Sequence, residues 1–352
     1  MAVYEARAEE WRDRRRPRFL DQVRALAAVT PPGAVSVDLG CGAGLHLPFL
    51  AFPVVALDAA HAMVRLAREA APDAWPVQAD LEALPFRRHA LGAGWARASY
   101  LHIPNVRLPA ALADLHHALA VDAPVHLVLH AGDTSGPLAD DDFPGRWFAG
   151  WTADALTDVL VGAGFTIDAC AVDADDRFWL EARVSRARTL PDTVGPGMRL
   201  LVCGLNPSVY SADAGIGFAR PGNRYWPAAL EAGLVTRDRD PRHALVAHGI
   251  GMTDLVKRAT PRADELTRDE YRAGLARVER MVEWLQPGAV GFVGLAGWRA
   301  AVDRGAVAGV QPGGIGGRPA YVMPSTSGLN ARVPPAELAD HLRAAAALAD
   351  TR

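Results

Sequence analysis

The sequence predicts an α/β protein with two domains, each a three-layer α/β/α sandwich. Its 352 residues exceed the roughly 250–300 at which a single hydrophobic core stops growing. β-Prone and helix-prone segments alternate along the chain, which is typical of a sheet covered by helices on both faces. The alternation is interrupted at residues 188–197, a polar stretch containing Arg and Pro that is expected to be a linker. We therefore expect one domain over residues 1–187 and another over residues 198–352.

The first domain is expected to begin with a helical cap over residues 1–30 and to continue as alternating strands and helices. The predicted strands are Val35–Leu39, Val54–Asp58, Gly92–Ala96, Val125–His130, Phe165–Val172 and Arg177–Val184. The predicted helices are His61–Ala70, Leu108–Leu119 and Trp151–Gly162, the last of which runs into the helix-stop sequence Gly-Ala-Gly.

The second domain repeats this alternation. Met198–Cys203 is a buried-strand run that opens a new sheet. Further strands are expected near Ile250, at Ala289–Val293 and at Ala320–Met323, the last after a Gly/Pro-rich segment, Gln311–Arg318. Helices are expected at Arg224–Ala232, Arg268–Leu285 and Pro335–Ala349.

Composition excludes several classes of protein. The three cysteines form no CxxC pair, which argues against a disulfide framework, a zinc knuckle and a four-cysteine iron–sulfur cluster. The eleven histidines form no HExxH motif, so no metal is expected. No apolar run approaches the ~18 residues of a membrane-spanning helix, and the N-terminus lacks the apolar stretch of a secretory signal. We therefore expect a soluble, cytoplasmic protein with no membrane partner, and its oligomeric state is left open.

Charge is unevenly distributed between the two halves. Residues 1–190 carry 18 Arg and 24 acidic residues, a net charge of −6, whereas residues 191–352 carry 19 basic and 16 acidic residues, a net charge of +3. This difference is a weak indication that the second half meets a polyanion. The chain has a single lysine, Lys257, and a biased composition is the preferred explanation.

A glycine-rich turn follows the first predicted strand. The segment Asp38-Leu-Gly40-Cys-Gly42-Ala-Gly44 places glycines where backbone N–H groups can approach a ligand closely. Asp58 ends the next strand, where a carboxylate can accept the hydroxyl groups of a ribose. Leu45 occupies the position at which the dinucleotide fingerprint GxGxxG requires glycine, so the pattern is not that of a dinucleotide site.

These residues resemble the class I S-adenosylmethionine-dependent methyltransferases over about residues 30–185. The family's D-x-G-x-G-x-G turn matches Asp38 to Gly44, its second-strand acid matches Asp58, and its acid after the third strand matches Asp80. The resemblance implies a Rossmann-like sheet with S-adenosylmethionine as cofactor. It implies that the methionine part meets Asp38 and the backbone of Gly40, Gly42 and Gly44, that Asp58 binds the ribose, and that Asp80 lies beside the adenine.

The sequence leaves the methyl acceptor unknown. The Asn/Asp-Pro-Pro-Tyr signature of amino-methylating DNA enzymes is missing after the fourth strand, as is the Pro-Cys nucleophile of cytosine C5 enzymes. Tyr100 and His102 follow that strand, where acceptor-facing residues could lie, and a packing or capping role for His102 is an equal alternative.

A second set of polar and aromatic residues follows strands of the second domain. Gly204-Leu-Asn206-Pro207 ends the strand that begins at Met198, so Asn206 projects from the carboxyl end of the strand, the usual place for a site in such a sheet. The segment from Gly217 to Trp226 mixes base-stacking and phosphate-binding side chains. Leu329 follows the last strand, and its apolar side chain could act as a wedge between bases.

Taken in order, these segments closely resemble the mismatch-specific uracil/thymine DNA glycosylases of the uracil-DNA glycosylase superfamily. The resemblance covers about residues 198–349. Four family motifs match Gly204–Pro207, Gly217–Trp226, Gly251–Val256 and Pro324–Gly328. Two residues depart from the family pattern: Ser208 replaces the usual glycine, and Asp254 places a carboxylate where the family has other side chains.

The resemblance implies a role for each matched residue. Asn206 would position the attacking water, Phe218 would stack on the extruded base, and Leu329, with Gly328, would fill the gap left in the duplex. The other residues expected to bind the base or DNA are Gly204, Pro207, Asn223, Arg224 and Ser327.

We therefore expect a base-excision repair glycosylase that removes uracil or thymine from G·U and G·T mismatches in double-stranded DNA, fused to a methyltransferase of unknown acceptor. Uracil leaves as a stabilised anion, which lessens the need for the second carboxylate of O-glycosidases. A mismatched base is also cheaper to flip. One alternative is a small-molecule methyltransferase whose C-terminal domain only binds nucleic acid. Another is a repair protein whose first domain binds the cofactor as a sensor and transfers nothing.

Overall fold

The computed structural model describes residues 2–330 and 332–350 and divides into two compact units. The first unit comprises Met1–Val161 and Phe165–Ala187, and the second comprises Gly162–Gly164 and Arg188–Arg352. The ends of the predicted domains at residues 1 and 351–352 lie outside the described residues. Residues 188–197, expected to be a linker, belong to the second unit because Thr193 exchanges two backbone hydrogen bonds with Met252. No helix within the described ranges is long and apolar enough to cross a membrane.

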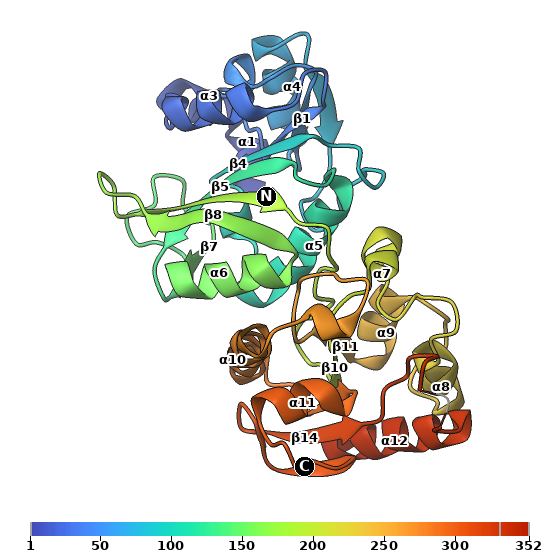
Figure 1. Cartoon of the computed structure of the whole chain (residues 1–352). Coiled ribbons are helices and arrows are strands. Elements are labelled where there is room, and N and C mark those ends of the chain that lie inside the picture. Colours follow the sequence, from blue (N-terminus) through green and yellow to red (C-terminus); the bar gives the residue numbers. More distant parts are fainter. Residues whose placement is uncertain (1, 331, 351–352) are drawn as a thin grey trace. The chain divides into compact units, whose positions relative to one another are not determined.

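The first unit is built on a nine-stranded sheet (Figure 1). Its parallel part runs in the order β3-β2-β1-β4-β5, with β1 Ser36–Leu39, β2 Val54–Asp58, β3 Trp75–Gln78, β4 Ala93–Arg97 and β5 Pro124–Ala131. Beyond β5 lie the antiparallel pair β9 (Trp179–Arg186) and β8 (Phe165–Val172), and the short strands β7 (Phe148–Trp151) and β6 (Ser135–Gly136). The strand order reverses between β1 and β4, so a crevice is expected at their carboxyl ends.

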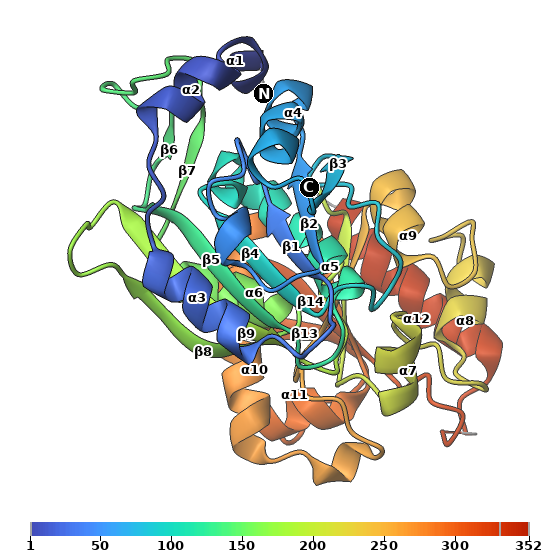
Figure 2. The ribbon, with the colours of Figure 1, turned by 90° about the horizontal axis from the view of Figure 1, so that it is seen from above.

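Helices cover both faces of this sheet. They are α1 (Ala2–Ala6), α2 (Ala8–Arg14), α3 (Leu20–Val29), α4 (His61–Ala70), α5 (Leu108–Ala118) and α6 (Ala153–Gly162), with 3₁₀ turns at Leu47–Phe49, Tyr100–His102 and Asn105–Arg107. Helices α3 and α4 share one buried cluster with β2 and β4, and Figure 1 shows α5 and α6 on the other face. Figure 2 shows α1 and α2 beside α4, which they contact.

The sequence missed the short strands β3, β6 and β7 of this unit. Strand β3 has four residues, none of them fully buried, so it carries no hydrophobic pattern. Trp151, predicted as the first residue of a helix, is instead the last residue of β7. The helix begins after Thr152, whose hydroxyl accepts the N–H of Ala155 at 3.2 Å and caps the first turn.

The second unit contains a five-stranded sheet in the order β11-β10-β12-β14-β13. Its strands are β10 (Leu200–Gly204), β11 (Ile250–Asp254), β12 (Ala289–Val293), β13 (Gly309–Ile315) and β14 (Arg318–Met323). All are parallel except β13, which pairs antiparallel with β14. The sequence missed β13 because its irregular pairing runs through a Gly/Pro-rich segment with glycines at positive φ.

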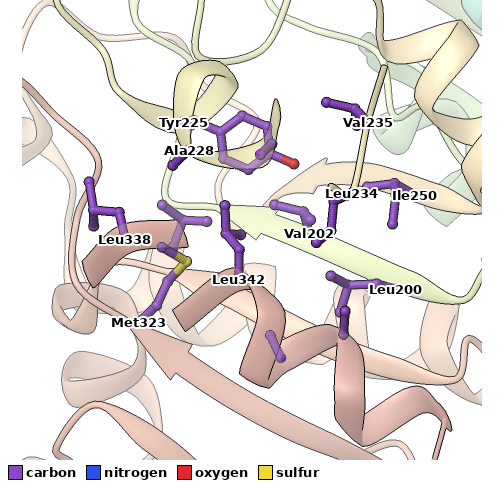
Figure 3. Packing of buried hydrophobic residues seen from close by; sticks show 14 of the residues in the cluster. Leu200, Val202, Tyr225, Ala228, Leu234, Val235, Ile250, Met323, Leu338 and Leu342 are labelled. Atoms are coloured by element: carbon purple, nitrogen blue, oxygen red, sulfur yellow. The ribbon is translucent and has the colours of Figure 1, made fainter. Parts of the chain in front are cut away.

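Helices flank this sheet on both faces. They are α7 (Val209–Ala214), α8 (Tyr225–Glu231), α9 (Pro241–His248), α10 (Arg268–Leu285), α11 (Leu295–Ala301) and α12 (Pro335–Ala347), with 3₁₀ turns at Ala263–Glu265 and Leu348–Asp350. Leu338 and Leu342 of α12 pack with Leu200 and Val202 of β10 in the core shown in Figure 3. Burying each such side chain contributes about 1.5–3 kcal/mol. The sequence missed the short helices α7, α9 and α11.

Candidate functional sites

The glycine turn after β1 has no room for side chains. Its backbone is left-handed, with φ of +77°, +52° and +80° at Gly40, Gly42 and Gly44. A Cβ on Gly40 would lie 2.3 Å from Ser99 Cβ, so only glycine fits there. A Cβ on Gly42 would lie 3.1 Å from the indole ring of Trp11, which belongs to α2. The turn is therefore a close-approach backbone surface, and α2 lies directly against it.

Asp38 and Arg97 are buried opposite charges at the carboxyl ends of β1 and β4. Among the described residues, Asp38 Oδ2 and Arg97 Nε have no hydrogen-bond partner. The Arg97 guanidinium lies 5.5 Å from the ring of Phe19 and 5.1 Å from that of Trp179. Burial, and then the negative charge of Asp58, raises the pKa of Asp38 to about 8, and burial lowers the pKa of Arg97 to about 10. Burial therefore keeps Asp38 mostly protonated at pH 7 in the absence of a ligand, and a cationic group bound beside it would favour its ionised form. Arg97 Nε is left to donate to an anionic group, so the two side chains fit a ligand that carries both charges.

Asp58 and Asp80 occupy different surroundings at the same edge of the sheet. Asp58 Oδ2 accepts the N–H of Gly42 at 2.9 Å, and Oδ1 accepts the N–H of Ala60 at 2.9 Å. Its carboxylate thus braces the glycine turn and keeps lone pairs for a further donor. Asp80 is exposed after β3, where its Oδ1 accepts the N–H of Glu82 at 3.0 Å.

His102 is held on both ring nitrogens. Nδ1 lies 2.6 Å from the carbonyl oxygen of Trp147, which can only accept, so Nδ1 carries the proton. Nε2 then accepts from the hydroxyl of Tyr4 at 2.7 Å, and Arg146 donates to that hydroxyl at 3.3 Å. Burial lowers the pKa of His102 to about 4, so the ring is neutral at pH 7. Tyr100, the other candidate beside it, is buried in the core.

Asn206 lies just beyond β10, and its amide group has a defined orientation. Its Nδ2 donates to the carbonyl oxygen of Arg258 at 3.0 Å and to the hydroxyl of Thr260 at 2.8 Å, with a longer contact of 3.2 Å to the carbonyl of Pro207. The Thr260 hydroxyl donates onward to the carbonyl of Arg262 at 2.8 Å, so it must accept from Asn206. These acceptors fix the amide nitrogen and leave Oδ1 as the acceptor that can hold a water.

Gly204, Phe218 and Asp254 converge next to Asn206. Gly204 is in register with Asp254 across β10 and β11. A Cβ on Gly204 would lie 2.5 Å from Asp254 Oδ1 and 3.3 Å from Phe218 Cζ. One face of the Phe218 ring stacks on Tyr225, with centroids 4.2 Å apart and planes at 23°. A planar ligand must therefore use the opposite face.

Ser208 is compatible with the turn although it replaces a glycine of the family pattern. Its backbone is extended, with φ −70° and ψ 155°, so glycine is not required. Its hydroxyl accepts the N–H of Ser211 at 3.1 Å and caps α7. Pro207 is buried, and its carbonyl oxygen accepts the N–H of Thr260 at 3.2 Å.

Leu329 is 90% exposed on a loop that Arg224 holds in place. The Arg224 guanidinium donates to the carbonyl oxygens of Val333 at 2.6 Å, Asn330 at 2.5 Å and Ser327 at 3.4 Å. Arg224, predicted as a DNA contact, is thus placed as a brace for this loop. An exposed leucine on a braced loop has the form expected of a wedge.

Two further contacts fix the segments on either side of Leu329. A Cβ on Gly328 would lie 2.9 Å from the carbonyl oxygen of Gly222, so the two loops touch. Asn223, also predicted as a DNA contact, accepts the N–H of Tyr225 at 2.9 Å and so orders the start of α8.

A cluster of charged side chains that the sequence did not predict surrounds Asp192, next to β11. Asp192 is buried and accepts from Lys257 Nζ, Arg277 Nη1 and the Thr253 hydroxyl, each at 2.7 Å. These partners hold the pKa of Asp192 below its usual range despite burial. The single lysine of the chain is therefore committed to a structural ion pair. Among the described residues, no cluster of three or more His, Cys, Asp or Glu side chains could hold a metal ion.

The chain is thus a fusion of two α/β units, each with polar residues at the carboxyl ends of its parallel strands. A family model described as a methyltransferase domain matches residues 37–122, and a model of the uracil DNA glycosylase superfamily matches residues 191–346. The chain carries a methyltransferase domain followed by a uracil DNA glycosylase superfamily domain, which confirms the two resemblances at the level of methyltransferase and of glycosylase superfamily.

Solved structures similar to this chain include several S-adenosylmethionine-dependent methyltransferases. One from Mesorhizobium loti is 21% identical, with 47% of this chain and 100% of that chain covered and a TM-score of 0.38. One from Methanosarcina mazei is 15% identical, with 44% and 92% covered and a TM-score of 0.39. A Burkholderia thailandensis 1,6-didemethyltoxoflavin-N1-methyltransferase is 19% identical, with 53% and 84% covered and a TM-score of 0.42.

The structure brings most of the predicted site residues together. It also adds two partners that the sequence did not predict. It brings the glycine turn, Asp38 and Asp58 together, and it places Phe218 against Gly204, two residues before Asn206. The sequence analysis missed Arg97. Its position as the one charged residue in the otherwise apolar strand β4 is the signal that could have identified it as a site residue. The sequence analysis also missed Thr260, whose partnership with Asn206 spans 54 positions.

Proposed function

We propose that the second domain is a DNA glycosylase that removes uracil or thymine from G·U and G·T mismatches in double-stranded DNA. The observation that carries this proposal is the orientation of Asn206, whose amide nitrogen is fixed by Arg258 and Thr260. Its Oδ1 is left to accept from a water beside Phe218. The glycosylase superfamily match over this domain supports DNA as the partner.

In this mechanism the base leaves the duplex and stacks on the open face of Phe218, while Leu329 fills the vacated space. The bond between C1′ and the base nitrogen breaks, and its electron pair leaves with the base. Asn206 Oδ1 orients a water that adds its hydroxyl to C1′, and the proton of that water neutralises the departing base. Holding the water in this orientation lowers the activation free energy, because the entropy cost of bringing it to C1′ is met before the bond breaks.

The test is an excision assay with duplexes containing G·U or G·T and with single-stranded uracil DNA, each followed by alkali treatment. We expect cleavage after alkali with G·U and G·T duplexes. The alternative, in which this domain only binds nucleic acid, predicts DNA binding without any alkali-labile product.

We propose that the first domain binds S-adenosylmethionine and transfers its methyl group to an acceptor not yet known. The residues fit the cofactor: the unpartnered Asp38 carboxyl and Arg97 guanidinium can bind the amino and carboxylate groups of an amino acid, and Asp58 keeps lone pairs for ribose hydroxyls. Asp80, exposed after β3, would lie beside the adenine. S-adenosylmethionine would supply an activated methyl group, and the Trp11 indole lies against the glycine turn at Gly42. Titration calorimetry with the full chain tests binding, and absence of heat and saturation at millimolar cofactor would count against it.

A further inference from the structure

Asp254 is placed at the base-binding face of the second domain by the geometry of the sheet. It is the last residue of β11, in register with Gly204 at the end of β10, so their side-chain directions lie on the same face. Thr253, one residue earlier, points the other way and bonds to Asp192. The space next to Gly204 is where the Asp254 carboxyl and the edge of the Phe218 ring meet.

The Asp254 carboxyl is left without a partner by its surroundings. Among the described residues, none forms a hydrogen bond to its side chain, although its backbone carbonyl accepts from Arg277 at 2.9 Å. The two nearby cations, Lys257 and Arg277, are both bound to Asp192. Burial and the negative charge of Asp192 disfavour the ionised form of this half-buried carboxyl, and the two cations that favour it are shared with Asp192.

We propose that Asp254 recognises the flipped base as a neutral carboxylic acid, donating its O–H to a ring carbonyl oxygen and accepting the neighbouring ring N–H. This inference rests on the proposed glycosylase function. Uracil and thymine present such an edge at N3–H and its flanking carbonyls, and hypoxanthine presents one at N1–H and its carbonyl. The substrate class is therefore a base with a ring N–H next to a ring carbonyl.

The neutral acid also suits the chemistry of departure. When the glycosidic bond breaks, its electron pair goes to the base and the negative charge spreads onto the ring carbonyl oxygens. A hydrogen bond from the Asp254 O–H then strengthens as the charge develops, without any proton transfer. An ionised Asp254 would instead repel the departing anion and oppose the carbonyl lone pairs.

The titration of Asp254 reflects groups on every element around it. Burial raises its pKa to about 6, Lys257 and Arg277 lower it, and Asp192 raises it. The Cys203 thiol on β10 is neutral, because burial raises its pKa far above pH 7. The acid form is half populated at this pKa, predominates below it, and declines about tenfold per pH unit well above it. Excision should therefore slow as the pH rises above about 6.

The experiment compares wild type, Asp254→Asn and Asp269→Asn in single-turnover excision from a G·U duplex between about pH 5.5 and 8.5. Asparagine offers one donor and one acceptor but does not titrate, and Asp269 is an exposed aspartate on α10 that serves as the matched control. We expect wild type and Asp269→Asn to slow about tenfold per pH unit above pH 6, and Asp254→Asn to give a flat profile. Uracil, thymine and hypoxanthine duplexes define the range of bases.

Three results would overturn the inference. Identical pH profiles for wild type and Asp254→Asn would show that the carboxyl does not face the base. A rate that rises with pH in wild type and is lost in Asp254→Asn would make Asp254 a general base for the water instead. An abasic duplex has no base for residue 254 to contact. If Asp254→Asn bound such a duplex more weakly than wild type does, the variant would have a folding defect and its excision rates would not support the inference. Failure of wild type to excise any base would instead refute the proposed function itself.

Discussion

The side-chain nitrogen of Asn206 lies 3.0 Å from the carbonyl oxygen of Arg258, 52 residues further along the chain. Together with the Thr260 hydroxyl at 2.8 Å, this contact decides which end of the amide faces the site. An amide pointing its nitrogen at the site would offer a donor where a water needs an acceptor. The loop after β11 thus determines the chemical character of a residue that follows β10.

Replacing Asn206 with alanine should abolish most turnover and spare DNA binding, because the water is oriented only after the base is flipped. Losing one such contact costs about 2.7–4 kcal/mol if it resembles a lost oxyanion donor, or about 10²–10³ in kcat. Thr260→Val, which releases the amide without removing it, should cause a smaller loss in kcat. Single-turnover rates and binding to an abasic duplex separate these effects. Full excision by Asn206→Ala would place the catalytic centre elsewhere.

Leu329→Ala should slow excision from a G·U duplex and leave single-stranded uracil DNA unaffected, since a single strand has no base stack to fill. Arg224→Met should act in the same direction through the loop, because it removes the donors to three loop carbonyls. Excision rates on the two substrates provide the comparison. An equal loss on both substrates by Leu329→Ala would mean that this side chain is not a wedge.

The glycosylase should leave an uncut abasic site. A lyase step needs an amine that forms a Schiff base, and the single lysine is bound to buried Asp192 at 2.7 Å. Strand cleavage should therefore require added alkali or heat. A protein–DNA adduct trapped by borohydride is the observation that would contradict this.

Arg97→Met should weaken binding of S-adenosylhomocysteine about 10–100-fold, because a charged hydrogen bond contributes about 1.5–3 kcal/mol. The same variant should bind 5′-methylthioadenosine, which lacks the amino-acid group, as tightly as wild type does. Calorimetry with both ligands gives the comparison. An Asp58→Ala variant is the matched contrast, because loss of the ribose contact should weaken both ligands. Equal weakening of both ligands by Arg97→Met would reject a carboxylate contact.

Asp192→Asn should lower the free energy of unfolding by about 3–5 kcal/mol, because it leaves Lys257 and Arg277 buried without a counter-charge. The folded-state pKa of Asp192 is lowered, so its contribution is present above the unfolded pKa of about 3.9 and is lost as the pH falls below it. Urea unfolding of the full chain near neutral pH and in acid measures both effects. An unchanged midpoint at neutral pH would show that the cluster does not stabilise the fold.

The sequence by itself determined the two α/β units, their regular strands and the positions of the motif residues. Helix α4 coincides with its predicted range, since its hydrophobic residues recur with helical period over three turns. Thr267 and Glu270 mark the start of α10 by a capping box that is local in the chain. Gly40 and Asn206 were found because each follows a strand directly in the sequence.

Only the tertiary structure decided how these residues act. The charge interaction of Arg97 with Asp38, the orientation of the Asn206 amide and the ion pair of Lys257 with Asp192 each involve residues more than 50 positions apart. Arg224 and Asn223 were expected to touch DNA, and the structure shows that each also holds a loop or helix of its own domain: two Arg224 nitrogens donate to loop carbonyls, and Asn223 Oδ1 accepts the N–H of Tyr225. Burial and hydrogen-bond partners set the charge and direction of a side chain, and both depend on packing that no local pattern encodes.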